Sequence, residues 1–316
     1  MRPSSISIRH LRYFDALSQH RHFGRAAEAC SISQPALSLQ MKELEELLGV
    51  ALIERGNRQI RLTSVGEAFE PRVREILRAV DELGELARAS ASPLGDRLRI
   101  GMIPTVAPYL LPSFAKRISE DFPDLELRPR EAVTQKLIED LLDGRLDAAV
   151  VALPVSEPSL HERLLFNEEF VLVRPWADRD KPVPCVEMLQ KMRLLLLEEG
   201  HCFRDQALSF CKLSPSSARE LMEGSSLSTL VQMVGAGLGV TLIPSMAVPN
   251  ETASARVSVA RLDTPRPVRS IGMVWRKTNP LAAGFSKIAD ILHEEYVRCG
   301  FAESGAEDTA ALQAAG

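Results

Sequence analysis

Two cysteines, Cys202 and Cys211, are the residues in this sequence best suited to redox chemistry. Cys202 follows a predicted strand, Leu194–Leu197, and so lies at the carboxyl end of a strand, where ligand sites of α/β proteins form. His201 and Arg204 flank Cys202 and favour its thiolate, the form that reacts with peroxides. Cys211 lies nine positions later and is a candidate resolving thiol.

The spacing of these cysteines limits how they can pair. If the stretch between them is helical, its rise of about 1.5 Å per residue keeps them ~13 Å apart. A disulfide needs Cα atoms within about 7 Å, so bridging requires the segment to unfold and refold, which would make a redox switch. The alternative is that both are inert cysteines of a hydrophobic core, and the spacing alone does not exclude it.

No other catalytic, nucleotide-binding or metal-binding motif is evident. The sequence lacks a Gly-rich phosphate loop, a His-Glu-x-x-His and paired Cys-x-x-Cys, and its six histidines lack metal-ligand spacing. The Gly-rich run 235–239 precedes a strand, which is the wrong context for dinucleotide binding. We therefore expect no enzyme activity, no cofactor and no metal. Cys30, Cys185 and Cys299 are expected to be structural or incidental.

An α/β body must position the two cysteines. Beyond a break at 91–96, short apolar runs alternate with helical patterns such as 134–142 and 227–235, which predicts mostly parallel sheets. The predicted strands are Leu98–Ile103, Leu125–Pro129, Ala148–Leu153, Phe170–Val173, Leu194–Leu197, Val240–Ile243 and Ile271–Trp275. The Ala-rich tail 302–316 is expected to be disordered.

The N-terminal residues predict a DNA-binding head. Residues 1–65 carry nine Lys and Arg against six Asp and Glu, a net charge of +3, whereas the remainder carries −7. Helical patterns from Ile8, from His22 and over 34–48 are joined by a tight turn, as in a helix-turn-helix. The third helix presents Gln34, Pro35, Ser38 and Lys42 on its exposed side. The alternative is a generic three-helix bundle with solvated polar faces.

Two further segments follow this third helix. Residues 51–53 and 59–62 alternate around a Gly-Asn pair, which predicts a hairpin wing whose Arg55 and Arg58 could reach phosphates or the minor groove. Apolar residues then recur at three- and four-residue spacings over 65–87, which favours a helix that pairs with a partner helix. The seam consists of Val65, Phe69, Val73, Ile76, Val80, Leu83 and Ala87. The alternative is a helix packed on its own domain.

Length and composition fit a protein of the cytoplasm. The chain has 316 residues, of which 45% are hydrophobic and 25% charged, and a net charge of −4. We expect neither a secretory signal, because the first residues lack an apolar run, nor a membrane span. Five cysteines without a signal do not indicate a disulfide scaffold.

The head resembles the winged helix-turn-helix of LysR-type transcriptional regulators. The resemblance rests on Leu11–Phe14, Phe23–Ala27, Ser33–Ser38, Leu44-Glu45, Leu48-Gly49 and Leu62–Gly66. It assigns Ser33, Gln34, Pro35, Ser38 and Lys42 to the recognition helix, and Arg55 and Arg58 to the wing. It implies a winged helix-turn-helix over 1–66, a linker and dimerisation helix over 67–92, and an effector domain over 93–301. That domain would have two Rossmann-like lobes, as in periplasmic binding proteins, with a ligand cleft between them.

The body resembles the peroxide-sensing activators of the same family. This likeness lies in 102–112, 200–211 and 271–276. It implies that hydrogen peroxide oxidises Cys202 to a sulfenic acid, that Cys211 resolves it as a disulfide, and that altered DNA contacts then control antioxidant genes. The residues that hold peroxide or orient the thiol would be Thr105, Thr134, His201, Asp205 and Arg276. Each threonine could also be a helix N-cap, and the two roles can coexist.

The implied partners are double-stranded promoter DNA, hydrogen peroxide, further copies of the chain in a dimer or tetramer, and RNA polymerase. Two other functions stay open. One is a LysR-type regulator that answers a small organic effector between the lobes. The other is a thiol peroxidase, against which the DNA-binding head argues.

Overall fold

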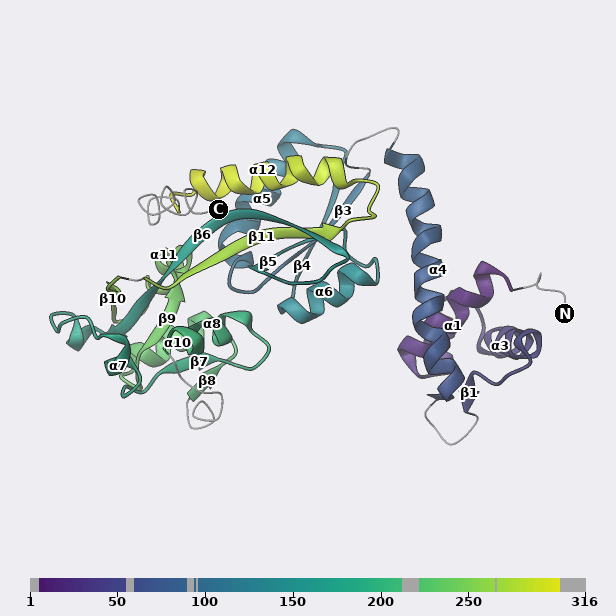
Figure 1. The fold of residues 1–316 in the computed structure, drawn as a ribbon, viewed down its shortest axis with the longest axis horizontal. Coiled ribbons are helices and arrows are strands. Elements are labelled where there is room, and N and C mark those ends of the chain that lie inside the picture. The colour runs from purple at the N-terminus through teal and green to yellow at the C-terminus, as the bar shows by residue number, and fades with distance from the viewer. Residues whose placement is uncertain are drawn as a thin grey trace. The chain divides into compact units, whose positions relative to one another are not determined.

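The protein is described from a computed structural model that covers residues 6–54, 60–89, 94, 96–211, 222–264 and 266–301 (Figure 1). It divides into two compact units, residues 1–87 and residues 88–316. The first is helical with one small hairpin, and the second mixes helices and strands. The predicted α/β class is confirmed.

Three helices and a hairpin form the head. They are α1 (Ile8–His20), α2 (Phe23–Ala29), α3 (Gln34–Leu48), β1 (Ile53–Glu54) and β2 (Arg61–Leu62), the two strands pairing antiparallel. Ser33 caps α3 by accepting the backbone N–H of Ala36 at 3.3 Å, and Gly49 ends it with a φ of +71°. Leu37 and Met41 are buried on the face of α3 that contacts α1 and α2. The predicted helix-turn-helix is therefore present.

The long helix α4 (Ser64–Ala89) starts within the core of the head. The Phe69 ring lies edge-on to Phe14 with 5.3 Å between centroids, and Val73 is only 1% exposed. Arg74 adds an ion pair to Asp15 of α1 at 3.3 Å. For Phe69 and Val73 the expected burial between subunits is therefore wrong, because these side chains pack on their own domain.

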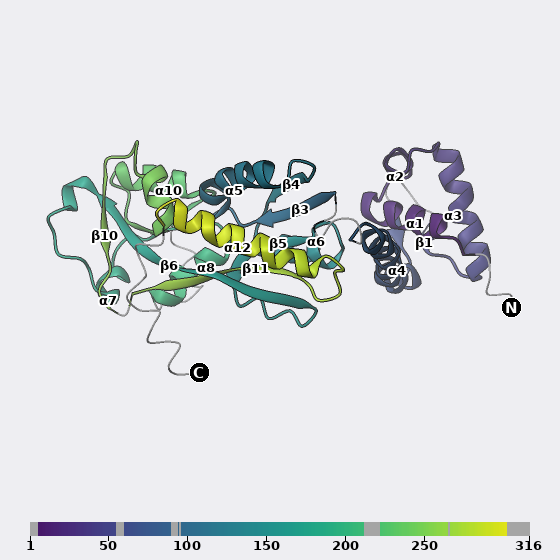
Figure 2. The ribbon, with the colours of Figure 1, turned by 90° about the horizontal axis from the view of Figure 1, so that it is seen from above.

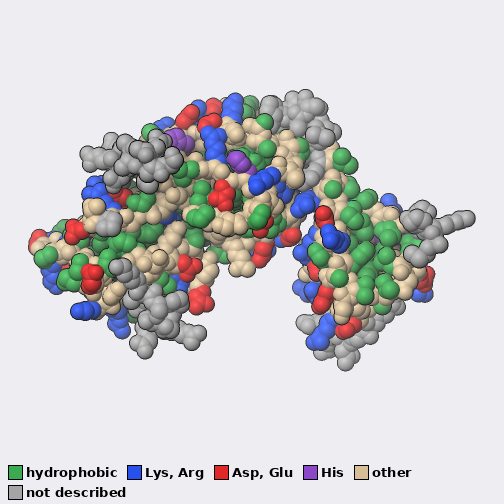
Figure 3. Space-filling model, viewed as in Figure 1, with side chains coloured by type: hydrophobic (Ala, Val, Ile, Leu, Met, Phe, Trp, Pro, Cys, Tyr) green, Lys and Arg blue, Asp and Glu red, His purple; other side chains and the backbone are tan. Residues whose placement is uncertain are grey.

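The later part of α4 has a different character. Ile76 and Leu83 are 46% and 67% exposed, and Val80 is half-buried. Figure 3 shows hydrophobic side chains on the surface of the head and along this helix. Among the seam residues whose side chains the structure describes, this later part and the exposed Val65 at the start of α4 remain available to a partner helix.

A seven-stranded sheet is the framework of the body. The strands β3 (Arg97–Met102), β4 (Glu126–Glu131) and β5 (Ala148–Leu153) are followed by the long β6 (Leu160–Pro175), β9 (Thr241–Pro244), β10 (Val257–Arg261) and β11 (Val268–Arg276). Their order is β10-β6-β11-β5-β3-β4, and β9 also pairs with β6. A separate parallel pair consists of β7 (Leu195–Leu197) and β8 (Met222–Gly224).

The strands β6 and β11 connect two lobes (Figure 1). The first lobe contains β3, β4, β5, α5 (Ala107–Asp121), α6 (Thr134–Leu142) and α12 (Ala282–Arg298). The second contains β7 to β10, α7 (Val186–Leu189), α8 (Cys202–Phe210), α10 (Leu227–Gly235) and α11 (Val248–Glu251), with 3₁₀ turns at Trp176–Asp178 and Ser245–Ala247. Helix α12 contacts α5 and β6 (Figure 2). One hydrophobic core runs through both lobes.

The expectation of mostly parallel sheets is wrong. In the large sheet only β3 pairs in parallel, with β4 and β5, whereas every pairing of β6 and β11 is antiparallel. The reason is that β6 extends over 16 residues, of which only Phe170–Val173 were predicted. Charged residues such as Glu168 interrupt its apolar pattern, yet they are buried in ion pairs.

No helix in the described part of the chain is both long enough and apolar enough to cross a bilayer.

Candidate functional site

Helix α8 carries the two candidate redox cysteines at its ends. It follows β7 and Gly200, whose φ of +95° suits glycine, and it begins at Cys202. The chain leaves the helix at Cys211, nine residues later, so the helical rise separates the two positions by about 13 Å. Both thiols are free. The sequence left open whether the stretch between the two cysteines is helical, and the structure shows that it is.

The two thiols have different surroundings. Cys202 is half-buried, at the helix N-terminus, where unpaired backbone N–H groups stabilise negative charge. Cys211 is completely buried, and burial raises its pKa to about 11. The side-chain amide of Gln190 donates to the Cys211 carbonyl at 2.9 Å. Cys211 is therefore a protonated, shielded thiol in this conformation.

The other buried side chains of α8 anchor it to the body. Phe203 lies edge-on to Phe170 with 4.8 Å between ring centroids. Arg204 is buried, donating to the Leu197 carbonyl at 2.8 Å and forming an ion pair with Glu223 at 2.6 Å. We expected Arg204 to favour the Cys202 thiolate, but its charge is already compensated by Glu223.

Thr105 is held by an arginine that the sequence analysis missed. Arg269 Nη1 donates to Thr105 Oγ1 at 2.7 Å, and Nη2 donates to the Thr105 carbonyl at 3.0 Å. The guanidinium lies 5.5 Å from the centroid of the Phe203 ring, next in sequence to Cys202. Arg269 thus links the predicted peroxide-binding threonine to the first turn of α8. Its only sequence signal was a charge preceding the apolar run Ile271–Trp275.

Arg276, the predicted arginine of the site, lies at the other end of the same strand. It is buried and donates to the carbonyls of Leu141 and Leu146, at 2.5 and 2.9 Å. A strand rises about 3.3 Å per residue, so Arg276 and Arg269 are about 23 Å apart along β11. The structure therefore does not bring Arg276 to Thr105. Both arginines border the same apolar run, and Arg269 is the one that contacts Thr105.

A cleft of about 200 Å³ lies between the two lobes, beside α8. Its lining includes Thr105 and His201, together with Pro104, Pro108, Tyr109, Glu131, Leu197, Ser225, Ser226, Leu227, Ser228 and Glu251. Tyr109 of the first lobe donates to Glu251 of the second at 2.7 Å, and Ser228 also donates to Glu251. Burial lowers the pKa of His201, against the opposing effect of Glu198 and Glu131, and so favours the neutral ring.

The remaining predicted pocket residues are placed differently. Thr134 is the first residue of α6, and its Oγ1 is buried without a hydrogen-bond partner among the described residues. Asp205 is exposed in the first turn of α8. The N-caps of α5 and α6 are Val106 and Val133, so the alternative role of Thr105 and Thr134 as N-caps is wrong.

The predicted DNA-binding residues of α3 share an exposed surface. Ser33, Gln34, Pro35, Ser38 and Lys42 are all exposed, while the opposite side of the helix is buried. Lys42 forms a surface ion pair with Glu46 at 3.5 Å, a weak contact that a phosphate could replace. The predicted wing is present as the β1–β2 hairpin, but Arg55 and Arg58 lie outside the described residues.

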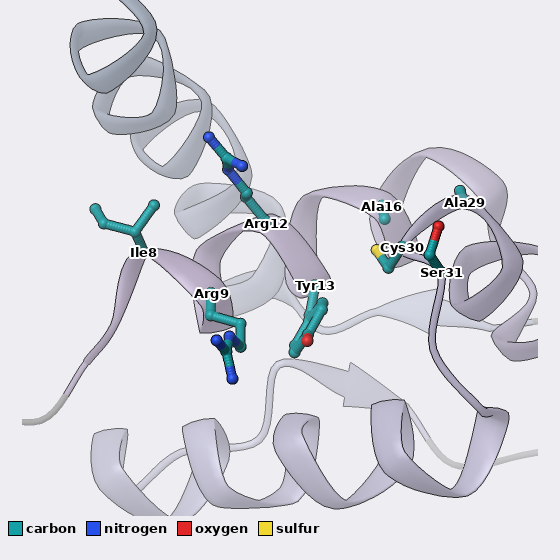
Figure 4. Close-up of a pocket in the computed structure, with 8 residues that line it drawn as sticks. All are labelled: Ile8, Arg9, Arg12, Tyr13, Ala16, Ala29, Cys30 and Ser31. Carbon is teal, nitrogen blue, oxygen red and sulfur yellow. The ribbon is translucent and has the colours of Figure 1, made fainter. Parts of the chain in front are cut away.

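The other three cysteines are separate from α8. Cys30 ends α2 and lines a pocket of about 540 Å³ in the head, with Arg9, Arg12 and Tyr13 of α1 (Figure 4). Burial, and secondarily Asp15, raises the pKa of Cys30. Cys185 and Cys299 are exposed. Within the described ranges no three His, Cys, Asp or Glu side chains gather as metal ligands would.

Comparison with known proteins gives the same division of the chain. Residues 8–67 match the bacterial regulatory helix-turn-helix proteins of the lysR family, and residues 91–297 match the LysR substrate binding domain. The DNA-binding transcriptional dual regulator OxyR of Escherichia coli is 40% identical over 293 residues, 91% of this chain and 95% of that protein. A probable hydrogen peroxide-inducible genes activator of Streptomyces viridosporus is 41% identical over 91% of this chain and 94% of its own length.

Solved structures agree with this result. A full-length OxyR variant from Pseudomonas aeruginosa has a TM-score of 0.73 and 36% identity, covering 91% of this chain and 94% of its own. A Corynebacterium glutamicum OxyR mutant with H₂O₂ bound has a TM-score of 0.64 and 35% identity, covering 93% of each chain. Both units of the fold are matched together in these proteins. The chain belongs to the LysR family of bacterial helix-turn-helix regulators and resembles its OxyR members.

Proposed function

We propose that this protein is a transcriptional regulator that senses hydrogen peroxide through oxidation of Cys202, which then forms a disulfide with Cys211. The observation that carries the proposal is helix α8, which places a half-buried thiol at its start and a fully buried thiol at its end. The similarity to hydrogen peroxide-inducible genes activators over nine-tenths of the chain supports the same function.

The chemistry takes two steps. The Cys202 thiolate attacks one peroxide oxygen, the O–O bond breaks, and the departing hydroxide takes a proton to become water, leaving a sulfenic acid. The Cys211 thiol then loses its proton and attacks the Cys202 sulfur, forming the disulfide and releasing a second water. Two thiols are oxidised and one peroxide is reduced. Thr105 and Arg269 supply hydrogen-bond donors for the departing oxygen.

The second step requires α8 to unfold. A separation of about 13 Å along the helix must fall below about 7 Å before the sulfurs can bond. The anchors that hold the helix, including Phe203 on Phe170 and Arg204 on Glu223, must then be released. We infer that this rearrangement of the second lobe changes how paired heads contact DNA.

The partners follow from the same proposal. The exposed face of α3 with Gln34 and Ser38 would read promoter DNA, and Arg55 and Arg58 would contact its backbone. The exposed Ile76 of α4 would pair subunits into a dimer or tetramer. RNA polymerase is the expected target of the activated form. Promoter DNA as the ligand would place the protein in the cytoplasm, where thiols are kept reduced, and regulation would need no catalytic turnover.

Peptide mapping after one equivalent of hydrogen peroxide, combined with a DNA footprint, tests the proposal. We expect a Cys202–Cys211 disulfide and an altered footprint. Cys202→Ser should abolish both, and Cys211→Ser should leave Cys202 oxidisable without a stable new footprint. Cys185→Ser is the matched control, since that thiol is exposed and outside α8. A normal response in Cys202→Ser, or a disulfide between other cysteines, would refute the proposal.

The cleft beside α8 favours a second candidate function, a response to a small organic effector. Its volume of about 200 Å³ and its Ser225–Ser228 edge suit a small polar ligand. This function predicts that cell metabolites alter the footprint of Cys202→Ser without peroxide. Peroxide consumption far above one equivalent per subunit, in the presence of a reductant, would instead identify a peroxidase.

A further inference from the structure

A buried ion pair joins the two long strands beside the proposed reaction site. Glu168 of β6 lies directly opposite Arg269 of β11, and both side chains are fully shielded from solvent. Glu168 Oε2 accepts a hydrogen bond from Arg269 Nε at 2.9 Å, and it forms an ion pair with Nη2 at 2.7 Å. We propose that Glu168 is a positioning residue for the reaction of Cys202 with peroxide, acting through Arg269 on Thr105. This inference rests on the proposed function.

The position of the Arg269 guanidinium is determined by Glu168 on one side. The second carboxylate oxygen, Oε1, accepts the backbone N–H of Met246 at 2.8 Å, so Glu168 is itself fixed to the second lobe. On its other side Arg269 donates to Thr105 in the turn after β3 of the first lobe. A continuous series of hydrogen bonds therefore crosses from Met246 to Thr105 and holds the guanidinium in one place.

This arrangement has a consequence for the Thr105 hydroxyl. Because Oγ1 already accepts from Arg269, its own O–H must point away from the guanidinium, leaving it available to a ligand. Arg269 makes three hydrogen bonds to Glu168 and Thr105, and its Nη2 also lies 2.7 Å from Glu168 Oε2 in the ion pair. The second N–H of Nη1 has no acceptor among the residues that the structure describes. The Thr105 hydroxyl, which lines the cleft, and one Nη1 N–H of Arg269 are thus two donors held next to each other.

A carboxylate is required at position 168 because every group that faces it is a donor. The Arg269 N–H groups approach one oxygen and the Met246 N–H approaches the other. An amide could accept from only one side, and its NH₂ group would oppose a donor on the other. Glu168→Gln therefore displaces Arg269 while nearly preserving side-chain volume.

The neighbouring residue provides a matched control. Glu169 is adjacent in β6, is also buried, and pairs with the partly exposed Arg266 at 3.0 Å. That pair has no contact with Thr105 among the described residues. Glu169→Gln therefore makes the same chemical change in the same strand without displacing Arg269.

The experiment compares two reactions of Cys202 in the full-length Cys211→Ser chain. One is oxidation by hydrogen peroxide, measured by trapping the sulfenic acid, and the other is alkylation by iodoacetamide at the same pH. We expect Glu168→Gln to slow oxidation at least ten-fold and to leave alkylation within two-fold, since donors for a departing oxygen serve only the first reaction. Glu169→Gln should change neither rate. Thermal unfolding confirms that the variants are folded.

Glu168→Asp retains the charge but is one methylene shorter, so it should fall between the parent and Glu168→Gln. If Glu168→Gln does not fold, the oxidation rate of Glu168→Asp tests the positioning role in its place. Equal oxidation rates in the parent and in the folded Glu168 variants would refute the positioning role. A parallel fall in oxidation and alkylation would show a merely structural role and would refute it too. A parent chain that peroxide does not oxidise at Cys202 would instead refute the proposed function, and this inference with it.

Discussion

Substitution of Ser209 by alanine or by glycine tests whether α8 must unfold before the disulfide closes. Ser209 is exposed near the end of α8, between the buried anchors of the helix and Cys211. Alanine is the best helix former, and glycine is about 1 kcal/mol less favourable in a helix interior. The two variants therefore alter the stability of α8 while changing only one exposed side chain.

The size of the effect follows from this difference. If local unfolding of α8 precedes attack by Cys211, a helix less stable by about 1 kcal/mol is unfolded about five times more often. Disulfide formation should therefore be up to about five-fold faster in Ser209→Gly than in Ser209→Ala, with the parent between them. Formation of the Cys202 sulfenic acid should be equal in all three, because that step takes place on the folded helix.

The assay is quenched flow with mass spectrometry, which separates the sulfenic acid from the disulfide in one time course. Ser119, exposed near the end of α5, supplies the control pair of Ser119→Ala and Ser119→Gly. These variants carry a similar helix cost but should not change either step. Equal disulfide rates in the two Ser209 variants would show that Cys211 reaches Cys202 without unfolding of α8, and would refute the reasoning.

Three shorter predictions concern other parts of the chain. Gln34→Ala should cost about 1–3 kcal/mol of discrimination between operator and scrambled DNA in fluorescence anisotropy, and an equal loss on both would argue against base contact. Ile76→Asp should dissociate the oligomer in light scattering with little change in Tm, whereas Val73→Asp should unfold the head; an intact oligomer in Ile76→Asp would argue against pairing there. The lowered pKa of His201 means that the unfolded chain binds the proton more readily, so stability falls as the pH drops below about 6.5. His201→Asn should therefore lose less Tm between pH 7.5 and 5.5 than the parent, and an equal loss would contradict this.

The sequence correctly predicted those helices and strands whose bounds are marked by neighbouring residues. Helix α3 has the predicted bounds, because Ser33, Pro35 and Gly49 mark its ends, and β5 is the uninterrupted apolar run Ala148–Leu153. The same kind of pattern did not predict the full length of β6. Its charged residues look solvent-exposed in the sequence, because their buried ion-pair partners are far away along the chain. The prediction that Phe69 and Val73 of α4 face a partner helix was wrong for a related reason. Spacing alone does not show which apolar residues pack within their own domain.

The choice between Arg269 and Arg276 shows the same limit at the site. Both lie in β11 on either side of the apolar run 271–275, and both are buried, so residue type and local sequence do not distinguish them. What distinguishes them is the register of β11, which sets Arg269 opposite Glu168 and Arg276 opposite Leu160. Strand register depends on residues a hundred positions away, and a single sequence does not reveal it.

The packing of α4 into the head has a mechanical consequence. Because Phe69 and Val73 belong to the same core as α1, helix α4 and the DNA-reading surface of the head move as one rigid body. Helix α4 has 26 residues and is thus a lever arm of about 39 Å. A tilt of about 10° at one end moves the other by roughly 7 Å, about two base-pair steps of B-DNA. In the proposed oligomer, a small change in the angle at which subunits meet would therefore be amplified into a new spacing of the heads, with no change inside the heads themselves.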